Sequence, residues 1–314
     1  MKTTQRLNAA FRRRLHVFRH NLSPGRFDSG ILSELPSCAP SRGARVAIFN
    51  HYDQYGRVDP YVAYHIRCIQ AMGFSVVFMS TASGIDAESL SRIKSMCWLI
   101  LQRRNIGLDI GGWPCAVRQI VRRGRLPLEA YSQIVLANDS VFGPLRPLDD
   151  IFRLMGARAL DMWGITESQE RARHVQSYFL VFQGRGVSFL ADWLRRYRVV
   201  ADREELISRY EVGLSLEARR AGLQSEALIS SDMLSATTPC EAPQLGLAKS
   251  GINPVHAYWR RTLELGAPFI KRDLVVRSES GTGEHLPWRD AIGELMPSYP
   301  LSLIEKYLET SRMR

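Results

Sequence analysis

Short apolar runs alternate with amphipathic segments through the middle of this 314-residue chain. Apolar runs bounded by turn residues are typical of buried strands, and apolar positions at three- and four-residue steps are typical of helices. The predicted strands are 46–49, 74–80, 98–101, 133–137, 161–165, 175–182 and one near Leu228. The predicted helices are 61–72, 87–96, 116–123, 148–155, 187–197 and two or three between 204 and 221. Such alternation predicts an α/β domain with a mainly parallel sheet that is covered on both faces.

The most informative stretch is the end of the strand near residue 137, where Asn138, Asp139 and Ser140 follow an apolar run. Ligands of open α/β sheets bind beyond the carboxyl ends of such strands. We therefore expect the triplet in a cleft, where the Asp139 carboxylate can hold a divalent metal ion or, through it, a sugar–nucleotide diphosphate. The alternative is a turn in which these side chains only bond their own backbone.

The first strand of the series also ends in polar residues, His51, Tyr52 and Asp53. His51 or Tyr52 can stack on a nucleotide base, and Asp53 can accept a hydrogen bond from a base or a ribose hydroxyl. Ordinary turn residues are the alternative interpretation. Both interpretations stay open at this point.

A glycine-rich segment follows the strand that ends near residue 101. Asn105 and Asp109 accompany three glycines at 107, 111 and 112, and a helix comes next. Glycine permits a close backbone approach, and a helix N-terminus favours a phosphate. We expect Asp109 in a tight loop ahead of the helix. The segment 108–112 also resembles the glycine-rich first motif of S-adenosylmethionine methyltransferases, although here two strand–helix units precede it.

Four downstream residues are further candidates. Glu211, expected in the first turn of a helix, is either a general base or a carboxylate favoured by the helix dipole. Glu167 ends another strand, and His256 lies in an aromatic segment where its role is structural or functional. Lys271, followed by Arg272, adds positive charge suited to a diphosphate leaving group.

The net charge of +11 is unevenly distributed. Residues 1–43 carry eight Lys or Arg against two acidic residues. Apolar residues lie along one side of a helix within this arm, at positions 7, 11, 15, 18 and 22. A basic amphipathic helix over 1–22 can bind an anionic membrane surface or dock on its own domain. A nucleic-acid partner is disfavoured, because no recognition helix, zinc spacing or aromatic-studded strand accompanies the charge.

Other function classes are disfavoured by what the sequence lacks. No run approaches the length of a membrane span, and no secretory signal pattern begins the chain. The five cysteines are widely spaced, which argues against a disulfide framework or a zinc site and favours the cytosol, at the inner face of a membrane. Dinucleotide-binding, P-loop and serine-nucleophile motifs do not occur.

Taken together, several ordered motifs resemble the rhamnan synthesis protein F family over roughly residues 45–275. The matching segments are IFNHYD (48–53), RN-x-G-x-DIGGW (104–113), LANDSVFGP (136–144), DMWGITES (161–168), HVQSYF (174–179), EVGLS (211–215) and NP-x-H (253–256). The resemblance implies a glycosyltransferase A-type Rossmann-like domain. It also implies bacterial surface polysaccharide assembly, with rhamnosyl transfer from a dTDP-L-rhamnose-like donor to a lipid-linked oligosaccharide acceptor.

In that fold an Asp-x-Asp element binds metal and diphosphate, and residues 138–140 stand in its place with one carboxylate. The resemblance assigns Asp139 to the diphosphate or to a Mg²⁺ or Mn²⁺ ion. It assigns the base role to Glu211, with Glu167 as the alternative. The donor-binding residues it implies are His51, Tyr52, Asp53, Asn105, Asp109, Asn138, Asp139, Ser140, His256 and Lys271.

The expected organisation is a basic arm and linker over 1–43, the transferase domain over 44–275, and a C-terminal extension over 276–314. Two other functions stay open beside the transferase. One is a binding module that recognises glycans or scaffolds an assembly complex without turnover, which the missing second carboxylate favours. The other is the methyltransferase suggested by the glycine-rich segment.

Overall fold

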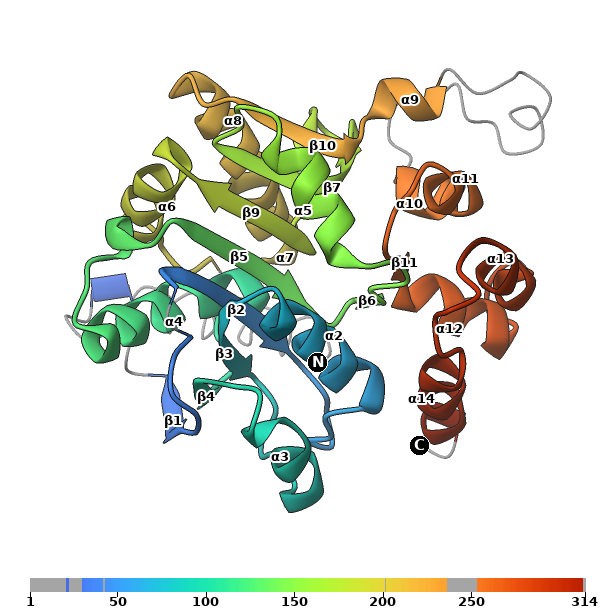
Figure 1. Cartoon of the computed structure of the whole chain (residues 1–314), viewed down its shortest axis with the longest axis horizontal. Helices are drawn as coiled ribbons and strands as arrows, with labels where there is room; N and C mark the ends of the chain where they lie inside the picture. Colours follow the sequence, from blue (N-terminus) through green and yellow to red (C-terminus); the bar gives the residue numbers. More distant parts are fainter. Residues whose placement is uncertain (1–20, 23–29, 42, 201, 236–252, 313–314) are drawn as a thin grey trace, which may run out of the picture.

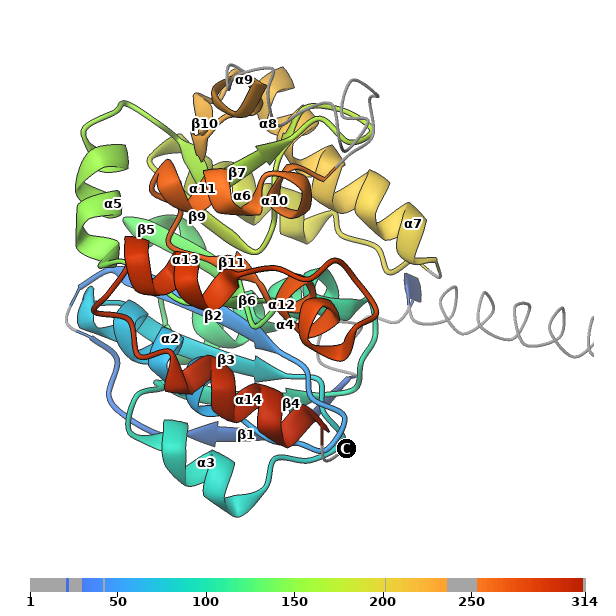
Figure 2. The same ribbon diagram turned by 90° about the vertical axis from the view of Figure 1, so that its right-hand side faces the viewer.

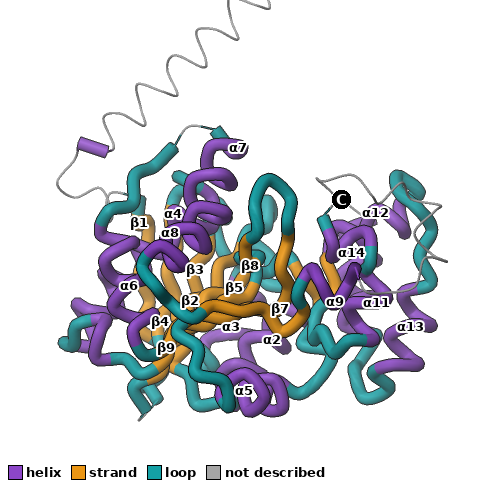
Figure 3. The backbone as a smooth tube through the Cα atoms, turned by 90° about the horizontal axis from the view of Figure 1, so that it is seen from above, coloured by secondary structure: helices purple, strands orange, loops and turns teal. Residues whose placement is uncertain are grey.

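A twisted β-sheet runs through the middle of the molecule, with helices on both sides (Figures 1 and 3). The computed structural model describes residues 21–22, 30–41, 43–200, 202–235 and 253–312. The amphipathic helix expected over 1–22 therefore lies outside the described residues, except for its last two positions. Among the described helices, none has the length and apolar character needed to cross a bilayer.

The sheet is mainly parallel, as the sequence predicts. In spatial order its strands are β1 (Ile31–Pro36), β4 (Leu99–Arg103), β3 (Ser75–Ser80), β2 (Arg45–His51), β5 (Gln133–Asn138), β9 (Phe179–Gln183), β7 (Met162–Ser168) and β10 (Ser225–Ile229). Strands β1 and β9 run against their neighbours. The short β8 (His174–Val175) pairs with β7, and β6 (Val141–Phe142) pairs with β11 (Ile270–Lys271) in a separate ribbon.

Two hydrophobic cores cover the two faces of the sheet. Successive side chains of a strand point to opposite faces, so Val46 and Ile48 of β2 pack into one core while Ala47 and Phe49 pack into the other. The first core contains α4 (Leu108–Gly124), η1 (Leu128–Ala130), α6 (Arg185–Arg195), α7 (Arg203–Leu206), η2 (Ile207–Val212) and α8 (Gly213–Arg220).

The second core joins the C-terminal helices to helices and strands from earlier in the chain. It contains α2 (Pro60–Ala71), α3 (Ala87–Lys94), α5 (Leu148–Gly156), α9 (Ser231–Ser235), α11 (Trp259–Glu264), α12 (Arg272–Ser280), α13 (Trp288–Leu295) and α14 (Ser302–Arg312). The short α10 (Pro254–Ala257) precedes α11. Figure 2 shows α13 and α14 on the same side of the sheet as α2. The boundary expected at residue 275 falls inside α12, and the segment beyond it shares this core.

Three local predictions are corrected by the structure. The basic arm and linker expected over 1–43 contain strand β1, whose backbone pairs with β4. The strand expected over 175–182 is split into β8 and β9, which both run antiparallel to β7 and are separated by an irregular stretch at 176–178 where the register shifts. The helix expected from residue 116 begins at Leu108, so Asp109 lies in its first turn and not in a loop ahead of it.

Close packing explains the glycines at the start of α4. A Cβ at Gly111 would overlap the carbonyl oxygen of Ile106, and a Cβ at Gly112 would lie 3.0 Å from Oδ1 of Asn50 in β2. Gly107, the N-cap, has a φ of 78°, in the left-handed region. The glycine-rich segment is thus a closely packed helix start.

Candidate active site

The tip of β5 is held by a local network of hydrogen bonds. Asn138 Oδ1 accepts hydrogen bonds from the backbone N of Ser140 at 3.1 Å and from its Oγ at 2.6 Å. Asn138 Nδ2 donates to Asp109 Oδ2 at 3.1 Å. The self-bonded turn considered from the sequence is therefore present. It also connects the tip to the first turn of α4, and this link orients Asp109 toward the carboxyl end of the sheet.

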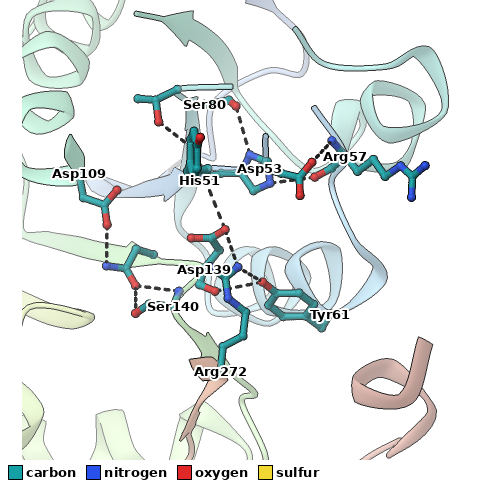
Figure 4. Close-up of polar contacts among 12 residues, drawn as sticks. His51, Asp53, Arg57, Tyr61, Ser80, Asp109, Asp139, Ser140 and Arg272 are labelled. Carbon is teal, nitrogen blue, oxygen red and sulfur yellow. Dashed lines mark hydrogen bonds and ion pairs between the residues drawn. The ribbon is translucent and has the colours of Figure 1, made fainter. Parts of the chain in front are cut away.

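Asp139 forms an ion pair that the sequence order alone does not suggest. Its Oδ2 lies 3.0 Å from Nη1 of Arg272, which is 133 positions later, and 3.4 Å from the backbone N of Tyr52 (Figure 4). The Asp139 side chain is only 7% exposed. The hydroxyl of Tyr61 donates to the Asp139 carbonyl oxygen at 3.0 Å and accepts from Arg272 Nη1 at 2.7 Å. Tyr61 is therefore hydrogen-bonded to both Asp139 and Arg272.

The pairing of β6 with β11 brings the two partners together. β6 directly follows the tip of β5, and Lys271 of β11 lies opposite Val141 of β6. The backbone N of Arg272 then donates to the carbonyl oxygen of Ser140 at 3.0 Å. Backbone hydrogen bonds thus hold Lys271 and Arg272 beside the tip, where both side chains reach the cavity described next.

A cavity of about 380 Å³ opens beside this tip. Its lining residues come from the β5 tip, the β7–β8 hairpin, α7 with η2, the segment at 253–256, and the start of α12. They are Ser140, Ser168, Glu170, Arg171, His174, Gln176, Arg203, Ile207, Glu211, Asn253, His256, Lys271, Arg272 and Asp273. Four predicted site residues therefore line one cavity, namely Ser140, Glu211, His256 and Lys271.

Glu211 is presented by an unusual piece of helix. The helical segment that begins at Arg203 passes through a π-helical turn, Ile207–Val212, before α8 continues it. Glu211 lies in this turn and not in the first turn of a helix, which corrects the sequence-based placement. Its Oε1 accepts hydrogen bonds from Ser177 N at 3.2 Å and Ser177 Oγ at 2.7 Å. Single π-turns inside helices frequently mark functional sites.

The charged groups around the cavity influence one another. Burial, together with the negative charges of Asp139 and Glu211, raises the pKa of Asp109 to about 6, against the opposing effects of Arg272 and Asn138. Burial lowers the pKa of Lys271, while Glu211, Asp273 and Asp109 oppose that shift. These mutual effects require proximity, so the carboxylates at 109, 139 and 211 converge on one region.

A second pair of charged groups lies at the start of α12. His256 Nε2 is 3.3 Å from Asp273 Oδ1. Burial alone would raise the pKa of Asp273, but the hydrogen bond and charge of His256, with Lys271 and Arg277, lower it to about 2. His256 is therefore positioned by a carboxylate that stays ionised at neutral pH.

Other predicted residues do not line this cavity. The ring of His51 is buried between Ser80 Oγ, at 3.1 Å, and the carbonyl oxygen of Arg57, at 3.0 Å (Figure 4). Asp53 accepts hydrogen bonds from the backbone N of Tyr55 and of Arg57, as a turn residue does.

The remaining predicted residues divide by their exposure. Tyr52 is 47% exposed and Asn105 is also exposed, so both are accessible near the sheet edge. Glu167 is buried, with its Oε2 2.7 Å from Nε of Arg173. That ion pair holds Glu167 outside the cavity lining and leaves Glu211 as the better placed of the two candidate bases.

Sequence reasoning missed three contributors to the site. Ser177 holds Glu211, and Arg171 and Arg203 add positive charge to the cavity lining. Arg171 is in turn bonded to Glu204 and to Ser208 Oγ. None of the three lies at the end of a parallel strand, which was the signal that singled out residues 138–140. The HVQSYF motif, which contains Ser177, was the available hint.

A divalent metal ion fits these residues poorly. Among the described residues, no three His, Cys, Asp or Glu side chains are grouped as metal ligands. The carboxylate of Asp139 is already bound by a guanidinium, and Asp109 Oδ2 accepts from Asn138. Asp139 alone offers one ligand group, whereas Mg²⁺ and Mn²⁺ favour several oxygen ligands.

Comparison with known proteins gives one family match. A family model described as rhamnan synthesis protein F matches residues 76–284. Among curated proteins, y4gN of Sinorhizobium fredii, described as uncharacterized, is 28% identical over 172 residues, which are 52% of this chain and 43% of that protein. The chain thus matches less than half the length of that relative. The virulence protein VirA of Vibrio anguillarum is 25% identical over 76% of this chain and 82% of its own.

Among solved structures the similarity is weaker. A nucleotide-diphospho-sugar transferase structure from Desulfovibrio desulfuricans has 14% identity, covers 70% of this chain and 96% of its own, and gives a TM-score of 0.34. The mannosyltransferase PcManGT of Pyrobaculum calidifontis, in complex with GDP-Man and Mn²⁺, has 9% identity, covers 98% and 92%, and gives a TM-score of 0.38. These values are too low to transfer a site or an activity.

Proposed function

This chain belongs to the rhamnan synthesis protein F family, and we propose on that basis that it is a glycosyltransferase of bacterial surface polysaccharide assembly. It transfers a rhamnosyl or related sugar from a nucleotide-sugar donor, such as dTDP-L-rhamnose, to a lipid-linked glycan. The observation that carries the proposal is the cavity at the carboxyl edge of a parallel sheet that Glu211 and Lys271 line together, with Asp109 and Asp139 close enough to influence the charges there.

The donor binds along the carboxyl ends of β2 and β5, as in a glycosyltransferase A-type domain. The exposed ring of Tyr52 offers a stacking surface for the base. Asn105, Asp109 and the tip at residues 138–140 contact the nucleotide. Its diphosphate points toward Lys271, where positive charge balances the charge of the departing group.

Glu211 is the general base of an inverting transfer. The acceptor hydroxyl oxygen forms the new bond to the anomeric carbon while the bond from that carbon to the diphosphate oxygen breaks. The hydroxyl proton passes to Glu211, and the electron pair leaves with the nucleoside diphosphate. Glu211 and Lys271 both line the cavity, so the base and the positive charge for the leaving group border the same space. His256, oriented by Asp273, assists the leaving group.

The acceptor and the place of action complete the proposal. A lipid-linked oligosaccharide brings the acceptor to the cytoplasmic face of the membrane, where the basic arm over 1–22 holds the enzyme near it. Deletion of 1–22 is expected to weaken binding to vesicles that contain anionic lipid. Unchanged vesicle binding would contradict the membrane role without touching the transferase.

A panel of nucleotide sugars tests the main proposal. A bound donor raises the apparent melting temperature by mass action, so thermal shift across dTDP-, UDP-, GDP- and CDP-sugars identifies the donor class. The matching donor is then followed for release of its nucleoside diphosphate with and without a lipid-linked acceptor. A chain that binds none of these donors is not a glycosyltransferase of this kind.

A binding module without turnover is the second candidate. It is favoured by the tip, which carries one carboxylate where glycosyltransferases of this type carry two, and that carboxylate is ion-paired. Such a module would bind glycan and give no release of nucleoside diphosphate from any donor. The same release assay therefore separates the two candidates.

A further inference from the structure

We propose that Arg272, bound to Asp139, supplies the fixed positive charge that holds the donor diphosphate, in the position where a divalent metal ion is expected. Donor binding then needs no metal ion. This inference rests on the proposed transferase function and adds to it the diphosphate-binding residue and the metal requirement.

The first support is the state of the Asp139 carboxylate. Its Oδ2 already accepts from Arg272 Nη1 at 3.0 Å and from Tyr52 N at 3.4 Å (Figure 4). The side chain is 7% exposed, so it is largely withdrawn from solvent ions. A metal ion bound by Asp139 would either lie against the guanidinium of Arg272 or displace it. A buried charge pair that loses one partner is strongly destabilised.

The second support is the placement of Arg272. Its backbone N bonds to Ser140 O at 3.0 Å, and its Nη1 bonds to the Tyr61 hydroxyl at 2.7 Å. Its side chain is 25% exposed and lines the cavity. Both hydrogen bonds of its side chain within the described residues come from Nη1. A guanidinium has five N–H donors in a planar fork, so the group can hold Asp139 and a phosphate together.

The third support is the charge around the cavity. Lys271 lies next to Arg272 on the chain, with its Nζ 4.4 Å from the centre of the Tyr178 ring. Arg171 and Arg203 line the cavity from two other elements. A divalent cation near Asp139 would be repelled by Lys271 and Arg272 at short range. A dianionic diphosphate would be attracted by the same groups.

Calorimetry with nucleoside diphosphates tests this directly. UDP, dTDP, GDP and CDP are titrated into the full chain, once in EDTA and once with excess Mg²⁺ or Mn²⁺. The wild type is expected to bind one of them with a Kd that differs by less than about threefold between the two conditions, since no charge-assisted contact is gained. Binding that appears only with the metal ion would overturn the inference and leave the transferase proposal standing.

Variants identify the responsible cation. Arg272→Gln is expected to weaken nucleoside diphosphate binding in EDTA by about 10- to 100-fold, the loss typical of a charge-assisted hydrogen bond. Because this change leaves Asp139 buried and unpaired, the double variant Asp139→Asn with Arg272→Gln is measured beside it. The double variant keeps a neutral pair at the tip and should show the same weakening. Arg153→Gln, in the exposed α5 pair with Asp150, is the charge-matched control.

Each outcome decides between named alternatives. A folded double variant that binds nucleoside diphosphate in EDTA as tightly as wild type would show that Arg272 is not the binding group. If no nucleoside diphosphate binds under either condition, the transferase proposal fails together with this inference. Equal weakening by the control Arg153→Gln would show only a general charge effect and would also count against Arg272.

Discussion

Ser177 and Glu211 are joined by two hydrogen bonds, from the Ser177 backbone N at 3.2 Å and from its Oγ at 2.7 Å, both to Oε1 of the carboxylate. The bonds cross from the turn between β8 and β9 to the π-helical turn Ile207–Val212. They fix Oε1, so the orientation of the carboxylate that lines the cavity is set before any ligand enters. A general base benefits from such orientation, because proton transfer requires hydrogen-bond geometry to the acceptor hydroxyl.

Glu211→Gln is expected to lower kcat for sugar transfer by about 100-fold or more, since an amide cannot take the acceptor proton. Donor binding should change little. The comparison is a transfer assay beside donor calorimetry. Glu217→Gln is the matched control, because Glu217 lies six residues after Glu211 and pairs with Arg196. Full transfer activity in Glu211→Gln would exclude Glu211 as the base.

Ser177→Ala tests the positioning role. The change removes the hydrogen bond from Oγ and keeps the one from the backbone N. We expect kcat to fall by about tenfold with KM nearly unchanged, which corresponds to an activation free energy higher by about 1.4 kcal/mol. Ser177→Thr restores the hydroxyl and should recover most of the rate. A fall that threonine does not rescue, or a change confined to KM, would contradict a role through Glu211.

Asp109 is predicted to reduce stability at neutral pH. Its pKa is raised from 3.8 to about 6 by burial and by Asp139. Between these two values the folded protein binds more protons than the unfolded chain, so the penalty is full above about pH 6 and disappears as the pH falls toward 4.

Asp109→Asn should therefore raise the free energy of unfolding at pH 7.5 by about 1–3 kcal/mol and have little effect at pH 4. Urea unfolding at both pH values measures this. Asp290→Asn, on the exposed surface of α13, is the control. A gain of equal size at both pH values would show that removal of the charge is not its cause.

His65 is predicted to make the fold sensitive to acid. It is fully buried between Phe49, Phe179 and Phe269, and among the described residues neither ring nitrogen has a hydrogen-bond partner. Burial lowers its pKa from 6.5 to about 3. Between pH 6.5 and 3 the histidine is protonated in the unfolded chain but not in the folded protein. The free energy of unfolding therefore falls as the pH drops through this range.

His65→Leu should flatten that part of the stability–pH curve and cost little at pH 8, because the neutral ring makes only packing contacts. Thermal or urea unfolding between pH 4 and 8 measures the slope. An unchanged slope in the variant would assign the acid sensitivity to other groups.

Gly111→Ala is predicted to destabilise the start of α4. The added Cβ would overlap the Ile106 carbonyl oxygen and lie 3.2 Å from the Tyr197 hydroxyl. We expect the free energy of unfolding to fall by about 1–3 kcal/mol, as overpacking does. Gly293→Ala, in α13 with nothing near its added Cβ, should instead be neutral or gain up to about 1 kcal/mol. Equal effects at both positions would contradict the packing explanation.

Most of the sheet could be predicted from local pattern. The strands at 46–49, 74–80 and 133–137 were placed within one or two residues, because a covered parallel strand is a continuous apolar run and needs no partner to be recognised. Strand β1 was missed, since an edge strand carries polar residues such as Ser33 and Glu34 and resembles a linker. Its place is set by pairing with β4, whose paired residues lie 63 to 72 positions later in the chain.

The site, too, has residues that the sequence could predict and residues that it could not. The polar triplet 138–140 was found because it ends an apolar strand, and its position at the carboxyl edge follows from the parallel sheet. The partner of its carboxylate could not be found, because Arg272 reaches Asp139 only through the pairing of β6 with β11. The placement of His51 and Asp53 could not be found either. Whether such residues face a ligand or their own backbone depends on packing around them.

The sequence by itself determined the fold class, the family and the carboxyl edge of the sheet as the place to look. These depend on local periodicity and ordered motifs, which the chain carries in its residue order. Only the tertiary structure decided which charges meet there, with Ser177 on Glu211, Arg173 on Glu167 and Arg272 on Asp139. The physical reason is that electrostatic interactions depend on distances in space, and those distances arise from contacts between segments far apart in the chain.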